Sequence, residues 1–112
     1  LKAVQTGYFY QKPQVAAKAL VGDENPETVG VWLEKVQRQL AALPTGDWRA
    51  DRIKDELTDV LEEEGLVPKQ LYPILREALT AAPQTPAIWE IMDILGQEES
   101  LERLEAAAAL VA

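Results

Sequence analysis

The sequence predicts an all-α fold, a compact bundle of five to seven short helices. Three observations support this prediction. Leu and Ala are frequent while β-branched residues are sparse, which favours helix over strand. Apolar residues recur every three or four positions, as on the buried face of a helix. Proline and glycine separate these stretches, so each helix is expected to be short and to end in a tight turn.

Residues 1–46 are predicted to form a first helical subdomain, itself only part of a larger region. Pro13 interrupts the chain after an aromatic segment at 7–10, which is expected to pack as an anchor, and a short helix follows that ends at Gly22. Asn25 as N-cap and Pro26 at the first helical position start a longer helix, expected to end near residue 42. Its predicted buried side chains are Val29, Trp32, Leu33, Val36, Leu40 and Leu43.

Residues 47–112 are predicted to form the second, C-terminal subdomain. Asp47 is expected to cap its first helix. Pro68 opens the next helix, whose early turns Pro73 should kink or make irregular. Thr85 and Pro86 repeat the N-cap and first-position pattern before a short helix, and the last helix is expected over residues 100–111. The predicted core residues are Trp48, Ile53, Leu57, Val60, Leu61, Leu71, Ile74, Leu75, Ala78, Leu79, Ile88, Ile91, Met92, Leu95, Leu101, Leu104, Ala108 and Val111.

Two missing residue types restrict the chemistry of this chain. It contains no Cys and no His, which excludes disulfides, thiolate metal sites, His-ligated zinc and nucleophiles activated by histidine. No apolar run approaches the roughly 20 residues of a membrane span, and no segment reads as a signal peptide. We therefore expect a cytoplasmic protein without membrane contact, metal or cofactor of its own. The chain starts at Leu1 rather than Met, which suggests an excised fragment.

The net charge of −8 is unevenly distributed. Residues 1–46 carry five Lys and Arg against four Asp and Glu, whereas residues 47–112 carry six against fifteen. Proteins that bind nucleic acid on their own are usually basic, because neutralising phosphates supplies most of their affinity. Any RNA contact made by this chain is therefore expected to be local and modest.

The C-terminal half resembles the C-terminal domain of bacterial glutamyl-tRNA synthetases. That family shows a Pro-Leu-Arg-x-Ala-Leu-Thr-Gly segment, a Pro followed by an apolar pair, Leu-Gly-Lys-Glu, and a final Arg-Leu pair. The corresponding segments here are residues 71–80, 85–90, 95–98 and 102–104, in the same order and at similar spacing. Upstream of these the resemblance is weaker in detail, but it extends over essentially the whole chain.

Three departures from the family pattern fall close to these segments. The proline precedes the Leu-Arg pair by one extra residue, as Pro73-Ile74-Leu75-Arg76. Ala81 replaces the glycine after Thr80, which is expected to change the backbone geometry of the loop. Gln97 replaces the lysine of Leu-Gly-Lys-Glu.

The resemblance implies the anticodon-binding part of a glutamate–tRNA ligase. Its expected partners are the anticodon loop of glutamate tRNA and the catalytic domain of the parent enzyme, which would use ATP and Mg²⁺, and the protein is expected to be a monomer. Carried over by position, the anticodon-contacting residues are Arg76, Thr85, Pro86 and Ile88, with Trp89 and Lys69 as further candidates. Arginine and the start of a helix are suited to this task, since both present N–H donors to bases and phosphates.

Structural interpretations compete with these roles. Arg76 can pair with Glu77 or Glu90, and tryptophans among Leu and Ile usually belong to the core. The candidates for phosphate contacts are Lys12, Lys18, Arg49, Arg52, Lys54 and Lys69. Arg49, Arg52 and Lys54 alternate with Asp47, Asp51 and Asp55, so local neutralisation is expected there. The acidic cluster at 59–64 is expected to be a solvated face.

Two other functions remain open. One is a helical protein–protein interaction module without RNA binding, and the other, ranked third, is a small hydrolase that uses paired carboxylates.

Overall fold

The structure, a computed structural model, describes residues 15–22, 24–82 and 85–111. Within these residues it is all helical, as predicted, and no strand occurs. The predicted aromatic anchor at 7–10 and the break at Pro13 lie outside the described residues. The elements in chain order are α2 (Ala17–Val21), α3 (Pro26–Ala41), the 3₁₀ turn η1 (Thr45–Asp47), α4 (Ala50–Glu64), α5 (Pro68–Thr80), α6 (Ile88–Leu95) and α7 (Gln97–Leu110).

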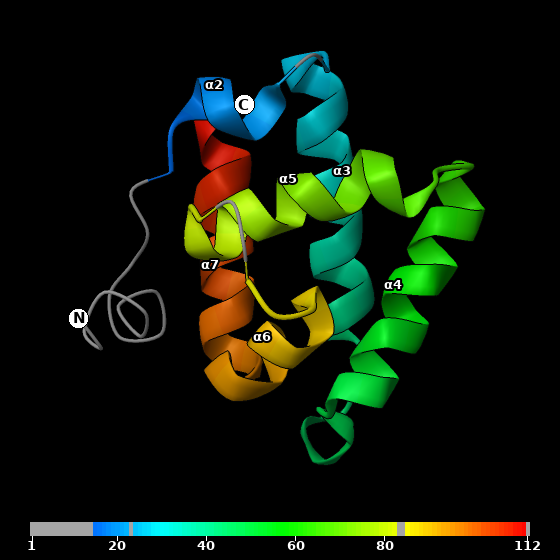
Figure 1. Cartoon of the computed structure of the whole chain (residues 1–112). Coiled ribbons are helices and arrows are strands. Elements are labelled where there is room, and N and C mark those ends of the chain that lie inside the picture. The colour runs from blue at the N-terminus through cyan, green and yellow to red at the C-terminus, as the bar shows by residue number, and fades with distance from the viewer. Residues whose placement is uncertain (1–14, 23, 83–84, 112) are drawn as a thin grey trace, which may run out of the picture.

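Helix α3 is the centre of the arrangement (Figure 1). It packs against α7 on one side and against α4 on the other, while α5 crosses it and also contacts α7. Helix α6 lies in the lower half of the molecule in this view, in contact with α4, α5 and α7. The candidate site residues therefore lie on α5, on α6 and on the segment between them, and both α4 and α5 contact α6.

The buried side chains form one apolar cluster. All the core residues predicted on α3 are buried, as are most of those predicted on the later helices; Trp48, Leu95, Leu101 and Ala108 are half-buried and pack against the cluster. Helices α3 and α7, from either side of residue 46, pack against each other within it. The division of the chain at residue 46 stays a prediction.

One predicted N-cap is confirmed, and its geometry explains why. The Asn25 side chain accepts a hydrogen bond from the Glu27 amide at 2.8 Å, and Pro26 occupies the first helical position. Both residues act within three positions of each other, so sequence alone is sufficient to recognise them.

The predicted cap at Asp47 is wrong. Asp47 ends the η1 turn, and α4 starts only at Ala50. The Ala50 amide instead donates to Oδ2 of Asp93, at 3.1 Å, on α6. Next to it, the Trp48 indole N–H donates to the Met92 carbonyl at 2.9 Å. The start of α4 is therefore stabilised by contacts with the end of α6, far away in the sequence.

The predicted start of α6 at Thr85 and Pro86 is also wrong. The helix begins at Ile88, and Ala87 is its N-cap residue. The Thr85 hydroxyl donates to the Pro86 carbonyl and accepts a hydrogen bond from Arg76, and no side chain caps the helix. Helix α7 likewise begins at Gln97, three residues before the predicted start.

Pro73 lies inside α5, which is helical without interruption from Pro68 to Thr80. The early turns of this helix are therefore not irregular. Proline has no N–H, so the carbonyl four residues earlier, on Lys69, loses its helical hydrogen bond. Pro73 is exposed, and water can solvate that carbonyl.

Two side chains from α7 satisfy carbonyls at the ends of other helices. Arg103 is 2% exposed; its Nη1 donates to the Leu79 carbonyl at 2.7 Å and its Nε to Oε2 of Glu99 at 2.8 Å. The Gln97 amide donates to the carbonyls of Leu40 and Leu43, at 3.1 and 2.8 Å. Cationic and amide groups at helix C-termini stabilise carbonyls that have no partner within the helix.

Ala81 adopts a left-handed backbone conformation, with φ 55° and ψ 28°. Its amide donates to the Glu77 carbonyl. Ala81 thus ends α5 in the way that a glycine normally does. The replacement of the family's glycine by Ala81 therefore leaves a backbone conformation that glycine favours. The side chain adds strain, because a Cβ is unfavourable in this region.

Replacing Ala81 with glycine is expected to stabilise the protein by about 0.5–1 kcal/mol, because the strain exceeds the entropic cost of glycine. Ala106→Gly, at an exposed position inside α7, is the matched control and should cost about 1 kcal/mol. Urea denaturation of the two variants and the parent measures both effects. A loss of stability in Ala81→Gly as large as in the control would contradict the left-handed assignment.

Candidate functional site

Arg76 and Thr85, two of the residues predicted to contact RNA, are joined by a hydrogen bond. The Nε of Arg76 donates to the Thr85 hydroxyl at 2.9 Å, across nine positions of sequence. The hydroxyl in turn donates to the Pro86 carbonyl at 2.9 Å. This pair of bonds fixes the base of the guanidinium and leaves its outer N–H groups available to a ligand, since arginine carries five N–H donors.

The end of α5 is shaped so that the chain can return to Arg76. Thr80 is buried; its hydroxyl donates to the Arg76 carbonyl at 2.8 Å and accepts from the Ala82 amide at 3.0 Å. Together with the left-handed Ala81, these bonds turn the backbone at the C-terminus of the helix. Arg76, in the last turns of α5, and the segment before α6 therefore lie side by side.

Arg76 makes no ion pair with a carboxylate among the described residues. The predicted competition from Glu77 and Glu90 is thus not seen, although Glu77 is its neighbour in the chain. Arg76 is half-buried, so part of its side chain is accessible to a ligand. A charged donor with planar, fork-like geometry is well suited to a base edge or a phosphate.

The other predicted contact residues differ in accessibility. Pro86 is exposed, whereas the Ile88 side chain is 1% exposed and belongs to the core. Ile88 can therefore offer a ligand little beyond its backbone at the first turn of α6, where N–H groups have no helical acceptor. Lys69 is exposed in the first turn of α5, beside a shallow hollow that also includes Pro73.

Trp89 is half-buried and lies between a ring and a cation. Its ring meets that of Tyr72 edge to face, with centroids 5.8 Å apart and planes at 72°. The Nζ of Lys54 lies 5.0 Å from the centroid of the Trp89 ring. Partial burial raises the pKa of the Tyr72 phenol, which is therefore uncharged at neutral pH.

The expected neutralisation of the basic residues Arg49, Arg52 and Lys54 is confirmed for the first two. Arg49 lies 3.4 Å from Asp51, and Arg52 lies 3.8 Å from Asp55. Lys54 instead extends over Trp89 and pairs with no carboxylate in the described part of the chain. The acidic end of α4 is exposed, and Glu63 pairs with Lys35 at 3.1 Å.

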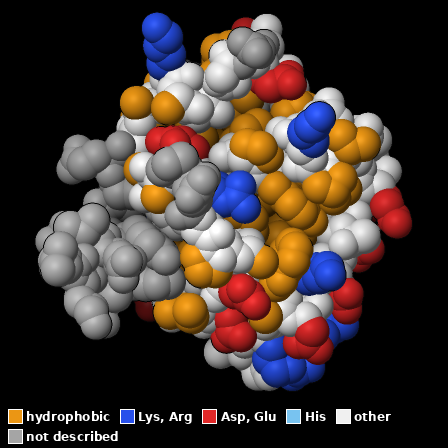
Figure 2. Space-filling view, in the orientation of Figure 1, with side chains coloured by type: hydrophobic (Ala, Val, Ile, Leu, Met, Phe, Trp, Pro, Cys, Tyr) orange, Lys and Arg blue, Asp and Glu red, His pale blue; other side chains and the backbone are white. Residues whose placement is uncertain are grey.

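Figure 2 shows the face on which α4, α5 and α6 meet. Apolar side chains gather at its centre over these helices, and single basic side chains lie among and beside them. Most of the acidic side chains in this view lie closer to its edges. The face thus combines apolar surface with positive charge in a chain whose net charge is −8.

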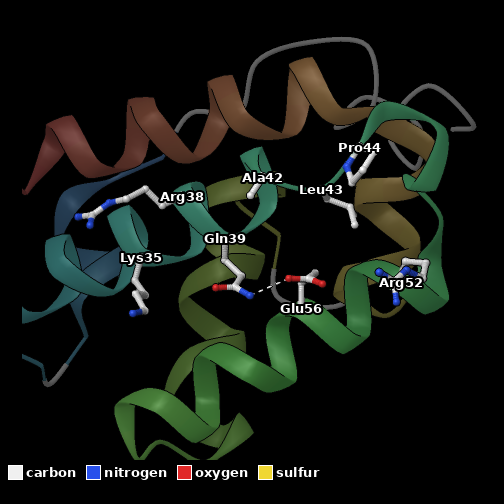
Figure 3. Close-up of a pocket in the computed structure, with 8 residues that line it drawn as sticks. All are labelled: Lys35, Arg38, Gln39, Ala42, Leu43, Pro44, Arg52 and Glu56. Carbon is white, nitrogen blue, oxygen red and sulfur yellow. Dashed lines mark hydrogen bonds between the residues drawn. The ribbon is translucent and has the colours of Figure 1, made fainter.

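A pocket between α3 and α4, with a volume of about 360 Å³, is an alternative location for a ligand. Gln39 and Glu56 point toward each other across it and form a hydrogen bond of 2.7 Å (Figure 3). Its basic side chains do not converge, since Lys35 and Arg38 point away from Arg52. Lys35 and Arg52 are moreover paired with carboxylates. This pocket is therefore poorly suited to an anion.

The described residues hold no cluster of three or more His, Cys, Asp or Glu side chains that could bind a metal ion. None of the helices in this part of the chain is long and apolar enough to cross a membrane.

Tyr72 belongs to this face but was not among the predicted site residues, and Lys54, a candidate for a phosphate contact, was expected to be neutralised by its aspartates. A helical signal for Tyr72 exists, since Lys69, Tyr72 and Arg76 follow one another at three- and four-residue spacing along one side of α5. Lys54 offers no such signal, because its approach to Trp89 depends on how α4 packs against α6.

Comparisons with known proteins agree on one family. The model of the anticodon binding domain matches residues 3–108. The glutamate–tRNA ligase of Corynebacterium efficiens is 42% identical over 115 aligned residues, which cover 97% of this chain and 23% of that protein. The glutamate–tRNA ligase of Thermodesulfovibrio yellowstonii is 33% identical over 97 residues, covering 87% of this chain and 20% of that protein.

A solved structure has the same fold. The glutamate tRNA ligase from Elizabethkingia meningosepticum, crystallised in complex with its amino acid, superposes with a TM-score of 0.83 at 22% identity. The match covers 98% of this chain and 21% of that one. The chain thus spans about a fifth of the length of these relatives.

Proposed function

We propose that this chain, which belongs to the anticodon-binding domain family and within it to the domains of glutamate–tRNA ligases, reads the anticodon loop of a glutamate tRNA. The observation that best supports this role is the hydrogen bond between Arg76 and Thr85. It joins two residues that the family resemblance assigns to the anticodon. The Arg76 guanidinium, moreover, pairs with no carboxylate in the described part. Pro86, whose carbonyl accepts from the Thr85 hydroxyl, is a further candidate contact, as are Lys69 on α5 and Trp89 on α6.

The proposed mechanism is discrimination between tRNAs. Splayed anticodon bases would meet the outer N–H groups of Arg76 and the segment before α6, where side chains and backbone amides can distinguish base edges. One good base contact is worth ~1–3 kcal/mol, which selects among tRNAs but does not hold one alone. The joining of glutamate to the tRNA, with ATP and Mg²⁺, would be carried out by the catalytic domain of the parent enzyme. We expect that enzyme to be a cytoplasmic monomer.

The rival function, a protein–protein interaction module, would need a large apolar docking surface. The large aliphatic side chains exposed in the described part are Val31, Val67, Ile94 and Leu110, which come from four separate segments. The apolar surface in Figure 2 is accompanied by basic side chains. This combination favours a polyanion over a protein partner.

Titration of the ¹⁵N-labelled chain with a glutamate-tRNA anticodon stem-loop tests the proposal. We expect amide shifts confined to the end of α5, to residues 85–89 and to their neighbours, because these surround the Arg76 guanidinium. The shifts should weaken between low salt and about 150 mM salt, since phosphate contacts release counterions. The control is a stem-loop of equal length with a scrambled loop. Equal shifts with both RNAs, or none with either, would overturn the proposed function.

A further inference from the structure

Thr80 is the last residue of α5, and at 5% exposure its side chain offers a ligand almost no surface. Its hydroxyl nevertheless makes two hydrogen bonds: it donates to the Arg76 carbonyl at 2.8 Å and accepts from the Ala82 amide at 3.0 Å. The first bond lies within the helix, where threonine hydroxyls often bond to the carbonyl four residues earlier. The second bond reaches beyond the helix, to the chain that leaves it.

The Ala82 amide shows what the hydroxyl contributes. When a left-handed residue ends a helix, the amide after it commonly bonds to a carbonyl of the last turn. Here Ala81 is the left-handed residue, and its own amide donates to the Glu77 carbonyl. The Ala82 amide has no backbone acceptor among the described residues and donates to the Thr80 hydroxyl instead. The direction in which the chain leaves α5 is therefore set by a side chain.

The last turn of α5 is held separately, by α7. The Leu79 carbonyl accepts a hydrogen bond from Nη1 of the buried Arg103 at 2.7 Å. This bond does not involve the Thr80 hydroxyl, so it remains when that hydroxyl is removed. Loss of the hydroxyl is therefore expected to release the chain after Thr80 without moving α5 away from α7.

Arg76 is bonded to both threonines. Its carbonyl accepts from the Thr80 hydroxyl, and its Nε donates to the Thr85 hydroxyl at 2.9 Å. The position of Thr85 depends on the path that the chain takes after α5, and the orientation of the guanidinium depends on Thr85. A change at Thr80 is therefore expected to reach the outer N–H groups of Arg76 without any contact between Thr80 and a ligand.

We propose that Thr80 is a positioning residue for anticodon discrimination: its hydroxyl sets the path of the chain after α5 and so holds Thr85 where it orients the Arg76 guanidinium. This inference rests on the proposed function, because the guanidinium is the group that would read the loop. Recognition of a base requires its donors to be held to within about 0.5 Å, whereas general attraction to phosphates depends on charge. Thr80 therefore affects the difference between two loop sequences and not the affinity for RNA as such.

Thr80→Val removes the hydroxyl and nearly keeps the shape of the side chain. The ratio of the affinities for the glutamate-tRNA stem-loop and the scrambled loop is expected to fall about threefold to tenfold, the range that one net hydrogen bond spans. The affinity for the scrambled loop and its salt dependence should not change, whereas partial unfolding would lower both affinities alike. Thr80→Ser keeps the hydroxyl and should restore the ratio of the parent chain.

Thr58→Val is the matched control. The Thr58 hydroxyl also donates to a carbonyl four residues earlier, that of Lys54, at 2.9 Å, but Thr58 is exposed on α4. This variant should discriminate between the loops like the parent chain. The Nε–H signal of Arg76 in the ¹⁵N spectrum reports the bond to Thr85. It should shift in Thr80→Val and stay in place in Thr80→Ser and Thr58→Val.

The outcomes distinguish this inference from the function it rests on. If the parent chain discriminates through Arg76 but Thr80→Val keeps the same ratio and the same Arg76 signal, Thr80 is not a positioning residue and the proposed function still holds. If the parent chain binds both loops equally or neither, both fail.

Should Thr80→Val not fold, the parent chain decides the question. Hydrogen exchange of the Ala82 amide is expected to slow when the stem-loop binds, because a ligand whose binding depends on the Thr80–Ala82 bond must also stabilise that bond. Unchanged exchange at Ala82 in the bound chain would refute the inference.

Discussion

Replacing Arg76 with alanine is expected to weaken binding of the glutamate-tRNA anticodon stem-loop about tenfold or more. The side chain is held through Nε by Thr85, and its outer N–H groups face no carboxylate within the described residues. A bidentate contact from such a group to a base is worth ~1–3 kcal/mol. Fluorescence anisotropy with a labelled stem-loop measures the loss directly.

Two further variants show whether the arginine acts by geometry or by charge. Arg76→Lys keeps the charge but not the planar fork, so it should recover little of the lost discrimination between loops. Arg49→Ala is the matched control, because Arg49 is an exposed arginine already paired with Asp51. If Arg49→Ala and Arg76→Ala reduce the affinity equally, the effect is one of general charge and the role assigned to Arg76 is wrong.

Replacing Arg103 with alanine is expected to cause the largest loss of stability, about 2–4 kcal/mol. The guanidinium is 2% exposed and donates to the Leu79 carbonyl and to Glu99, so its removal leaves polar groups without a donor inside the bundle. Breaking a buried pair costs ~3–5 kcal/mol, and the lower figure allows for the partial exposure of Glu99 to water. Thermal denaturation should show a fall in Tm of about 10 °C or more.

The large loss of stability expected for Arg103→Ala depends on the burial of Arg103, and not on its charge alone. Arg49→Ala again serves as the control and should change stability by no more than about 0.5 kcal/mol. Arg103→Lys can still donate to one of the two oxygens, so an intermediate loss is expected. A loss below about 1 kcal/mol in Arg103→Ala would mean that the carbonyl at the end of α5 finds another donor.

How well the sequence predicts a helix start depends on how far along the chain the residue lies that accepts the hydrogen bond from the first-turn amide. Asn25 caps α3 through an amide two residues later, and the prediction there is confirmed. Asp47 carries the same kind of side chain before α4, but Asp93 takes over the contact from a distance of 43 residues. Thr85 does not cap α6, which begins only at Ile88, and its hydroxyl instead bonds to Arg76 and to the Pro86 carbonyl. Asn, Asp and Thr are all good N-cap residues, yet whether each one caps a helix here depends on tertiary contacts. The spacing of residues in the sequence does not reveal those contacts.

The candidate site was predictable where the family resemblance and helix geometry act together. The resemblance points to Arg76 and Thr85, and the structure places these two within a hydrogen bond. Their roles toward RNA stay predictions. Lys54 was expected to be neutralised by its aspartates, and that expectation is wrong because α4 packs so that Lys54 reaches Trp89. Ile88 was carried over as a contact residue, but its side chain lies in the core.

Gln97 links the end of α3 and the turn that follows it to the first turn of α7. Its amide reaches the carbonyls of Leu40 and Leu43, and its oxygen accepts from the Thr45 hydroxyl at 3.2 Å. A lysine, which the family carries at this position, can donate but cannot accept, so it would lose the contact with Thr45. We therefore expect the end of α3 and the first turn of α7 to exchange their amide hydrogens as one cooperative unit, protected together and released together.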